Sequence, residues 1–398
     1  MIPFSPPHID QRHIDAVVEV LKSGWITTGL KTKSFEKKLA LYAGNPNTLC
    51  VNSATAGLEL MLHWFGVKAG DEVIVPTYTY CATANVVVHC GATPVFVDVD
   101  ENFCISVEGI RNAITEKTKA IIPVDFAGFP CDYDAINALV HEPHFNHMFL
   151  PTSENQEKLD RILVLSDGAH SIGAHYKGKR TGNLTDATAF SFHAVKNLTT
   201  AEGGAIALNL PEPFKNEEVY QLLCIKSLHG QNKDALSKLK LGAWKYDIIE
   251  PGYKCNMTDI TAALGLVELD RYETETLPRR KEIFKIYDSI LKNYPWAQLP
   301  LYETAERTSS YHLYPLRVRG ITEAKRDEMI TKVSEHEVTV NVHFIPVPMM
   351  SYYKSRGYDI KNYPVTYDNY SREISLPVYY DLKDEQARLV AETVAKSY

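Results

Sequence analysis

Between residues 50 and 210, apolar residues occur in short continuous runs that alternate with segments of helical spacing. A run of four to eight residues that is rich in β-branched side chains is typical of a strand buried on both faces of a sheet. Four runs have this character. They are EVIVP (72–76), PVFVDVD (94–100), KAIIPVDF (119–126) and RILVLSD (161–167).

Three segments between these runs repeat apolar residues at helical spacing, at 81–91, 105–115 and 132–142. Alternating strands and helices predict right-handed crossovers and a mostly parallel sheet with helices on both faces. Two later runs, DATAFSF (186–192) and GGAIALNL (203–210), are separated only by a loop and predict further strands of the same sheet. The predicted fold class is α/β.

The pattern changes twice after residue 141. Residues 142–160 are polar and contain proline, which indicates a surface insertion. A long helical stretch covers 256–294, with a break near Pro278, and links a large domain (1–250) to a smaller α+β part within 251–398. That part contains two strand-like runs and a closing helix, at 311–319, 338–347 and 384–395.

The composition narrows the class of protein. The chain has 398 residues, of which 45% are hydrophobic and 23% charged, as is usual for a globular protein of two domains. A net charge of −7 without any basic run argues against a nucleic-acid partner. We expect no signal peptide and no membrane segment, because no apolar run approaches the roughly 20 residues that span a bilayer. Seven scattered cysteines without a C-x-x-C pair indicate neither a disulfide framework nor a metal site, and favour the cytoplasm.

Ligands of an open α/β sheet bind beyond the carboxyl ends of its strands. At one such point, in VNSATAGLELML (51–62), Asn52 or Ser53 can cap a helix that begins with the small residues Ala54 and Thr55. Free N–H groups at such a helix start form a phosphate site, although the same pattern also fits a capped helix without a ligand.

Three further strand ends carry unusual residues. Tyr78 and Tyr80 follow one strand and offer an aromatic ring for stacking, although they also suit simple packing. Asp167 ends a strongly apolar run, where a carboxylate is costly unless a cation, or a structural salt bridge or cap, meets it. Lys196 lies 29 residues after Asp167, across one strand, so that both can reach the same sheet edge.

A phosphate cradle, a stacking ring, a buried acid and a lysine are together what pyridoxal 5'-phosphate requires of a protein. The lysine forms a Schiff base with it, the acid keeps its pyridine nitrogen protonated, and the phosphate is anchored separately. The four features stand in an order along the chain that suits this cofactor.

The chain resembles the DegT–StrS family of pyridoxal-phosphate-dependent nucleotide-sugar aminotransferases. The resemblance implies fold type I, with a seven-stranded, mostly parallel sheet in the large domain and a smaller C-terminal α+β domain. It extends over nearly the whole chain. The motifs that carry it are SGWITTG (23–29), NSATAG (52–57), GDEVIVPTYTYCAT (70–83), GATPVFVDVD (91–100), SDGAH (166–170), SFHAVKNLTTAEGG (191–204) and GYKCNMTDITAALGL (252–266).

The resemblance also implies roles for individual residues. Lys196 would be the Schiff-base lysine, Asp167 the partner of the pyridine nitrogen, and Tyr80 the stacking aromatic residue. The loop around Lys254, Cys255 and Asn256 would reach the active site of a neighbouring subunit, which implies a homodimer. The other cofactor-binding positions would be Ala54, Thr55, His170, Ser191 and Asn256. The substrate-binding positions would be Thr27, Thr28, His193, Lys254 and His343.

Three positions depart from the family pattern. Asp125 stands where many members have histidine, Gly168 replaces a common alanine, and Cys255 replaces an aromatic residue. These differences affect the expected substrate contacts more than the cofactor chemistry.

The implied reaction moves an amino group from L-glutamate, which leaves as 2-oxoglutarate, to a nucleotide-linked 4-keto-6-deoxy sugar. The branch that it resembles uses UDP-linked sugars, and the product would serve the synthesis of a cell-surface polysaccharide or glycan. The acceptor could instead be a dTDP-linked 3- or 4-keto sugar. A sugar dehydratase and a non-catalytic regulator are competing functions. Lys196 favours transamination, because the related dehydratases carry histidine there. A nicotinamide dehydrogenase is disfavoured, since no G-x-G-x-x-G follows the first strand.

Overall fold

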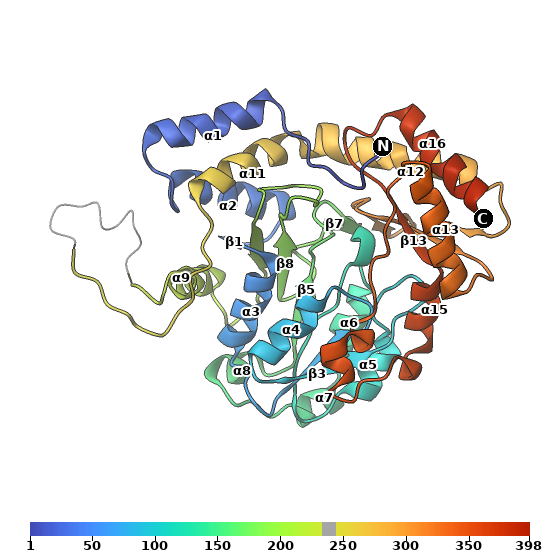
Figure 1. Cartoon of the computed structure of the whole chain (residues 1–398). Coiled ribbons are helices and arrows are strands. Elements are labelled where there is room, and N and C mark those ends of the chain that lie inside the picture. Colours follow the sequence, from blue (N-terminus) through green and yellow to red (C-terminus); the bar gives the residue numbers. More distant parts are fainter. Residues whose placement is uncertain (233–243) are drawn as a thin grey trace.

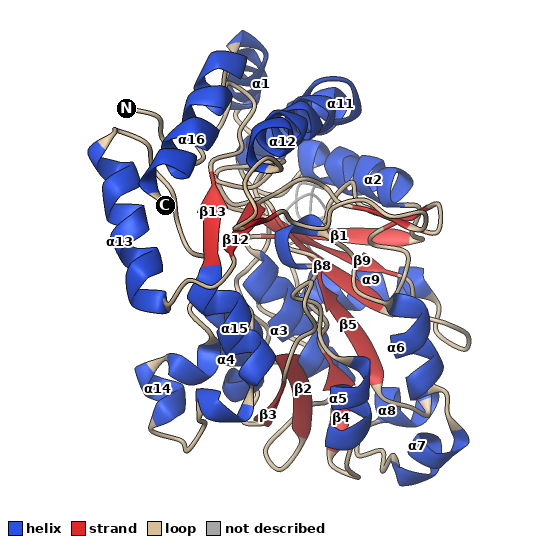
Figure 2. Cartoon of the chain, turned by 90° about the vertical axis from the view of Figure 1, so that its right-hand side faces the viewer, coloured by secondary structure: helices blue, strands red, loops and turns tan. Residues whose placement is uncertain are grey.

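A computed structural model describes residues 1–232 and 244–398. A seven-stranded sheet forms the centre of the larger part, and helices cover both of its faces (Figures 1 and 2). The predicted α/β class is thereby confirmed. In spatial order the strands are β1 (Asn47–Val51), β9 (Gly204–Leu208), β8 (Ala187–Ser191), β5 (Leu163–Asp167), β4 (Thr118–Ile121), β2 (Glu72–Pro76) and β3 (Thr93–Val97).

The direction of each strand follows from its connection. Strands β2, β3, β4, β5 and β8 are joined through helical crossovers or longer excursions and pair in parallel. Only a loop of residues 192–203 connects β8 to β9, and these two strands pair antiparallel. Because β9 is also antiparallel to β1, the sheet is mixed but mostly parallel. The pattern of the sequence had not assigned β1, whose run NTLCV is short and begins with polar residues.

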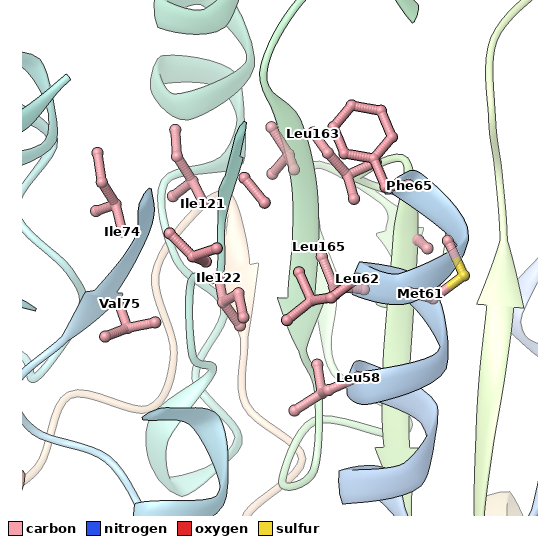
Figure 3. Packing of buried hydrophobic residues seen from close by; sticks show 14 of the residues in the cluster. Leu58, Met61, Leu62, Phe65, Ile74, Val75, Ile121, Ile122, Leu163 and Leu165 are labelled. Atoms are coloured by element: carbon pink, nitrogen blue, oxygen red, sulfur yellow. The ribbon is translucent and has the colours of Figure 1, made fainter. Parts of the chain in front are cut away.

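Helix α3 (Ala54–Phe65) packs on one face of the sheet. Figure 3 shows its residues Leu58, Leu62 and Phe65 beside Leu163 and Leu165 of β5. All five side chains are buried. Since successive residues of a strand point to opposite faces, neighbouring positions of the strands face other helices on the far side.

The far side of the sheet is covered by α2 (Leu30–Ala43) and α11 (Asp259–Arg271). Phe35 and Leu39 of α2 join Cys50 of β1 and Ala205 of β9 in one hydrophobic cluster. Helix α1 (Gln11–Ser23) lies along α11, outside this layer (Figure 1). Both faces of the sheet are therefore buried, as its apolar strands require.

The three helices predicted between the strands are present, and the segment 142–160 contains two more. Ser153 caps the second of these and donates its hydroxyl hydrogen to the carbonyl of Phe65 at 2.8 Å. Phe145 and Leu159 are buried, so the segment packs on the core rather than forming a simple surface loop. These helices are α4 (Cys81–His89), α5 (Val107–Ala113), α6 (Tyr133–Val140), α7 (Pro143–Met148) and α8 (Glu154–Leu159), and α9 (Asn216–Lys226) follows the sheet.

The long helical stretch predicted for 256–294 is present in three continuous pieces. Helix α11 ends at Arg271, a π-helical turn covers Tyr272–Thr276, and α12 (Leu277–Leu291) follows. Pro278 lies in the first turn of α12, directly after the π-helical turn, and it has no N–H to donate to that turn. The predicted break is therefore a change of helical winding and not an interruption.

The C-terminal part has its own hydrophobic cluster, which includes Leu316, Ile374 and Val390 and also Ile2 from the start of the chain. The strand predicted at 311–319 is β12, and the closing helix is α16 (Asp384–Ser397). A domain boundary at 250/251 stays a prediction. The remaining helices are α13 (Glu323–Glu335), α14 (Ser351–Lys354) and α15 (Pro364–Arg372). One short sheet consists of β10 (Ala297–Gln298), β12 (Tyr314–Val318) and β13 (Glu373–Leu376). Another consists of β11 (Arg307–Thr308), β6 (His175–Tyr176) and β7 (Lys179–Arg180).

The strand predicted at 338–347 is wrong. This segment makes only two isolated bridges, from Val338 to Ile2 and from Asn341 to Ser375. Its Val338 and Val340 belong to the C-terminal cluster, whereas Val342 and Phe344 pack in a cluster with Tyr78. A run of alternating apolar residues is thus used to join the two parts of the molecule and not to extend a sheet.

Three global features concern the described residues only. None of their helices has the length and apolarity needed to cross a membrane. They contain no group of three or more His, Cys, Asp or Glu side chains arranged to hold a metal ion. All seven cysteines are free. A location in the cytoplasm stays a prediction.

Candidate active site

A cavity of about 420 Å³ opens at the carboxyl ends of the parallel strands. It brings together residues that follow β1, β2, β5 and β8, because parallel strands end at the same edge of a sheet. Most of the predicted site residues line it. They are Ala54, Thr55, Tyr80, Asp167, His170, Ser191, His193, Lys196 and His343.

The start of α3 forms one wall of the cavity. Ser53 is its N-cap, and the Ser53 hydroxyl accepts a hydrogen bond from the Ala56 N–H at 3.1 Å. Ala54 and Thr55 line the cavity, and N–H groups at these first positions have no acceptor within their own helix. Gly204 of β9 passes so close that a Cβ there would lie 2.5 Å from the Ala54 nitrogen. The result is a cradle of N–H groups at the positive end of a helix, which suits a phosphate.

Asp167 lies at the end of β5 and is almost fully buried, with 7% of its surface exposed. Its Oδ2 accepts a hydrogen bond from the Thr83 hydroxyl at 2.8 Å, and its Oδ1 accepts one from the Ala169 N–H at 3.2 Å. Burial raises the pKa of Asp167, while these donors and the charge of Lys196 oppose the rise. A cationic group in the cavity would stabilise the ionised carboxylate further.

Lys196 lies in the loop between β8 and β9, and its N–H donates to the carbonyl of His193 at 2.9 Å. The side chain is half-buried and lines the cavity. Its surroundings lower the pKa of Lys196 to about 8, chiefly through loss of hydration, with Asp167 opposing the shift. More of Lys196 than of an ordinary lysine is therefore a neutral amine near neutral pH, which is the form that attacks a carbonyl carbon.

Two buried histidines, His170 and His312, line the cavity side by side, with their ring centroids 4.2 Å apart and their ring planes tilted by 42°. Nδ1 of His170 accepts a hydrogen bond from the Ala127 N–H at 3.2 Å, so its ring proton is on Nε2. Nδ1 of His312 lies 2.8 Å from Oδ1 of Asn197. Burial lowers the pKa of both rings well below the usual range, and both are neutral.

Four predicted site residues do not line the cavity of the single chain. Thr28, Lys254 and Asn256 form a separate network, in which Asn256 donates to the Thr28 hydroxyl at 2.6 Å and Lys254 donates to Asn256 at 2.7 Å. Thr27 accepts from the Asp259 N–H at 3.1 Å through its carbonyl. Their predicted roles stay predictions.

Residues 7–148 and 150–395 match the DegT/DnrJ/EryC1/StrS aminotransferase family. The chain belongs to this family. The resemblance seen in the sequence motifs is thereby confirmed, and with it the class of enzyme, a pyridoxal-phosphate-dependent sugar aminotransferase of fold type I.

Three relatives illustrate the match. Spr1654 of Streptococcus pneumoniae, described as a sugar aminotransferase, is 46% identical, and its PMP form superposes with a TM-score of 0.96 over 100% of this chain and 99% of that one. SpsC of Bacillus subtilis, a spore coat polysaccharide biosynthesis protein, is 38% identical over 99% of this chain and 96% of its own length. PseC of Helicobacter pylori, an aminotransferase of pseudoaminic acid biosynthesis, is 28% identical, with a TM-score of 0.86 over 100% and 99% of the two chains.

Pyridoxal 5'-phosphate is the cofactor of this aminotransferase, and Spr1654 is known in both a PLP and a PMP form. The cavity fits this group on three counts. Small residues and N–H groups surround a place for the phosphate at the start of α3. A cation would stabilise the buried carboxylate of Asp167, and the amine of Lys196 lies in the same cavity.

Some cavity residues of this aminotransferase were not singled out from the sequence. Phe4 and Ser5 come from the first residues of the chain, and the Ser5 hydroxyl donates to the carbonyl of Val195 at 3.2 Å. Thr79, His312 and Phe344 also line the cavity. His312 stands at the start of a predicted strand, whereas ligands are expected beyond the carboxyl ends, so the strand pattern gave no signal for it.

The departures Asp125 and Gly168 have structural explanations. Asp125 does not line the cavity; it is fully buried and accepts hydrogen bonds from the Tyr133 hydroxyl at 2.6 Å and the Cys131 N–H at 3.0 Å. A Cβ at Gly168 would lie 2.6 Å from Cγ2 of Thr188, so the common alanine does not fit beside this threonine. Asp125 therefore lies outside the cavity in which its substrate contacts were expected.

Proposed function

We propose that this aminotransferase moves an amino group from L-glutamate to a UDP-linked 4-keto-6-deoxy sugar that carries a 2-acetamido group. The observation that supports a transaminase most directly is the pairing of a low-pKa Lys196 with a buried Asp167 in one cavity. The sugar class is supported by the family and by the relatives SpsC and PseC, which serve polysaccharide and pseudoaminic acid synthesis. The product would likewise enter a cell-surface polysaccharide or glycan.

In the proposed mechanism each cavity residue has one task. Pyridoxal phosphate, when bound, supplies an electron sink for the bonds at the reacting carbon. Lys196 would hold the cofactor, and its freed amine would then carry a proton from one carbon to another. Asp167 would hold the pyridine nitrogen in its protonated form, and the first turn of α3 with Ser191 would bind the phosphate.

The remaining cavity residues would position the ring and the substrates. His170 would lie beside the ring and Tyr80, which is 60% exposed at the cavity, would stack on it. His193 and His343 would contact the substrate. Because glutamate and the keto sugar would use the same cavity in turn, a ping-pong kinetic pattern is expected.

The acceptor is tested with glutamate and a panel of keto sugars, with products identified by mass spectrometry. The panel contains UDP- and dTDP-linked 4-keto sugars and a 3-keto isomer, and kcat/KM is measured for each. We expect the UDP-linked 4-keto sugar to give the highest value and the Lys196→Ala variant to give no amino sugar. A preference for the 3-keto isomer would show that carbon 4 is not the position aminated. A preference for the dTDP-linked sugar would show that the nucleotide is not UDP. Loss of a hydroxyl without exchange of an amino group would instead identify a dehydratase.

We also propose that the active unit is a homodimer in which the loop of residues 252–256 serves the partner's cavity. Lys254 and Asn256 lie outside the cavity of their own chain. The segment before them exposes large apolar side chains, which a second copy of the chain would cover. These side chains are Trp244, Tyr246, Ile248 and Ile249. Thr27 and Thr28, which lie next to Asn256 and Asp259, would join the same shared site.

A further inference from the structure

His343 is held on every side except the one that faces the cavity. Its N–H donates to Oε2 of Glu373 at 3.0 Å, and its carbonyl accepts from the Tyr78 hydroxyl at 2.5 Å. The ring stacks on Phe4 with a centroid distance of 5.3 Å. Nδ1 lies 3.0 Å from the Ser375 hydroxyl. Nε2 is the ring nitrogen left for a ligand, and His343 lines the cavity.

A buried carboxyl group lies behind this histidine. Glu373 is fully buried in β13, and its Oε1 lies 2.5 Å from the hydroxyl oxygen of Ser375, which is also fully buried. Ser375 therefore bridges Glu373 and His343 with one hydroxyl group. Since this hydroxyl has a single hydrogen, it donates to one of these neighbours and accepts from the other.

The bridge allows two arrangements of protons. When Glu373 is ionised, Ser375 donates to it, and His343 must donate from Nδ1 to Ser375, which leaves Nε2 as an acceptor. When Glu373 takes up a proton on Oε1, it donates to Ser375, and Ser375 donates to Nδ1. The ring proton of His343 is then on Nε2. The second arrangement contains one proton more, carried by Glu373, and the imidazole is neutral in both.

We propose that Glu373 and Ser375 are positioning residues that set the ring tautomer of His343, and that protonated Glu373 makes Nε2 a hydrogen-bond donor to an oxygen of the keto sugar. This inference rests on the proposed function only for the identity of the sugar. The proton arrangement itself follows from the three side chains. Donation to a substrate oxygen would favour keto or hydroxyl groups at that point of the cavity over groups that are themselves only donors.

The surroundings fit a protonated Glu373 near neutral pH. Burial raises the pKa of Glu373 to about 8, although the hydrogen bonds and the charges of Arg317 and Arg326 oppose the rise. Burial and the charge of Lys196 lower the pKa of His343 to about 4, so the ring stays neutral. The other titratable groups that face the pair are the Tyr78 hydroxyl and the neutral rings of His170 and His312.

The variant Glu373→Gln distinguishes the two arrangements. The backbone N–H of His343 requires an acceptor, so the amide oxygen faces it and the amide NH₂ faces Ser375. Ser375 must then donate to Nδ1, and the neutral ring of His343 keeps its proton on Nε2 whatever the pH. In Ser375→Ala the bridge is lost. Ser375→Thr keeps a hydroxyl and serves as the conservative variant. Ser371→Ala serves as the matched control, because it removes a buried hydroxyl that donates to the Asp368 carbonyl at 3.2 Å and takes no part in the bridge.

The first readout is the tautomer of His343, measured by ¹⁵N NMR of full-length protein labelled in histidine. The His343 signals are those missing from His343→Gln. We expect the wild-type proton to move from Nε2 at pH 6.5 to Nδ1 at pH 9.5, and Glu373→Gln to keep it on Nε2. If Glu373→Gln and wild type show the same tautomer at pH 9.5, the proposal is wrong. This readout does not depend on the sugar.

The second readout separates the two half-reactions in single turnovers. Glutamate consumption should change by less than about twofold in Glu373→Gln and Ser375→Ala. With the UDP-linked 4-keto sugar at pH 7, KM should rise about tenfold in Ser375→Ala, the size expected for one lost hydrogen bond, and recover in Ser375→Thr. Between pH 7 and 9.5 the wild type should lose acceptor affinity, and Glu373→Gln should not. Equal losses in both would overturn the proposal. A wild type that does not aminate this sugar refutes the proposed acceptor and leaves the first readout to decide.

Discussion

The hydroxyl of Thr83 donates to Oδ2 of Asp167 across 2.8 Å, and both side chains are buried. Thr79 lies 2.7 Å from the same hydroxyl oxygen. Because Thr83 has one hydroxyl hydrogen and gives it to the carboxylate, Thr79 must donate to Thr83. A chain of two hydroxyls, from Thr79 just before α4 and Thr83 in its first turn, therefore favours the ionised form of Asp167, as Lys196 does, and counters the effect of burial on its pKa.

Replacing Thr83 by valine should lower kcat by roughly tenfold at neutral pH, the scale of one hydrogen bond to a charged group. Loss of this donor raises the pKa of Asp167 further, so the carboxylate takes up a proton at a higher pH. The acid side of the kcat profile should therefore move to higher pH. Thr83→Ser keeps the hydroxyl and should retain the wild-type profile. An unchanged acid limb in Thr83→Val would show that Thr83 does not act through Asp167.

The low pKa of Lys196 predicts how the enzyme free of cofactor takes up pyridoxal phosphate. Only the neutral amine can bond to the aldehyde, so the rate of uptake should rise with pH around a midpoint near 8, well below the ordinary lysine value of 10.5. The rate is measured by stopped-flow absorbance. Asp167 raises the pKa of Lys196, so Asp167→Asn should move the midpoint lower. A midpoint near 10, or a shift upward in Asp167→Asn, would contradict the assignment of this environment.

Much of the central sheet could be predicted from the sequence, because its strands are continuous apolar runs between helices. The Ser53 cap of α3 could also be predicted, because capping depends on the local sequence. The approach of Lys196 to Asp167 could be predicted as well, because the topology places these two residues at one edge of the sheet. The segment 338–347 shows the limit of this reasoning. Its alternation is typical of a strand, yet a bridge from Asn341 to Ser375 and packing against Tyr78 determine its path.

Several of the residues that were missed have partners that are distant in sequence. Phe4 reaches His343 from the opposite end of the chain. Glu373 is the first residue of the short strand β13, and nothing in its local sequence indicates that it bonds His343. Contacts of this kind depend on how the two parts of the molecule pack together, and a pattern with a period of a few residues does not record that packing.

Gly168 offers a test of the steric account of a departure from the family. In Gly168→Ala the new Cβ would lie 2.6 Å from Cγ2 of Thr188, so the free energy of unfolding should fall by about 1–3 kcal/mol, as is usual for overpacking. Thr188→Ser removes that methyl group and should restore part of the loss in the double variant. Urea unfolding of the four proteins gives the coupling between the two positions. Losses that simply add would mean that the methyl group of Thr188 is not the obstacle.

The shared site of the proposed homodimer can be tested by mixing two inactive variants. Lys196→Ala lacks the reactive amine, and Asn256→Ala should lose most activity because its neighbour's cavity is incomplete. When both are coexpressed, half of the dimers combine the two chains, and each has one cavity with an intact Lys196 and an intact Asn256 from the partner. Activity should then return to about a quarter of the wild-type value. As a control, Lys196→Ala mixed with Asp167→Asn should stay inactive, because these two residues belong to the same chain's cavity. If the first mixture also stays inactive, or if Asn256→Ala alone is fully active, the loop does not complete the partner's site.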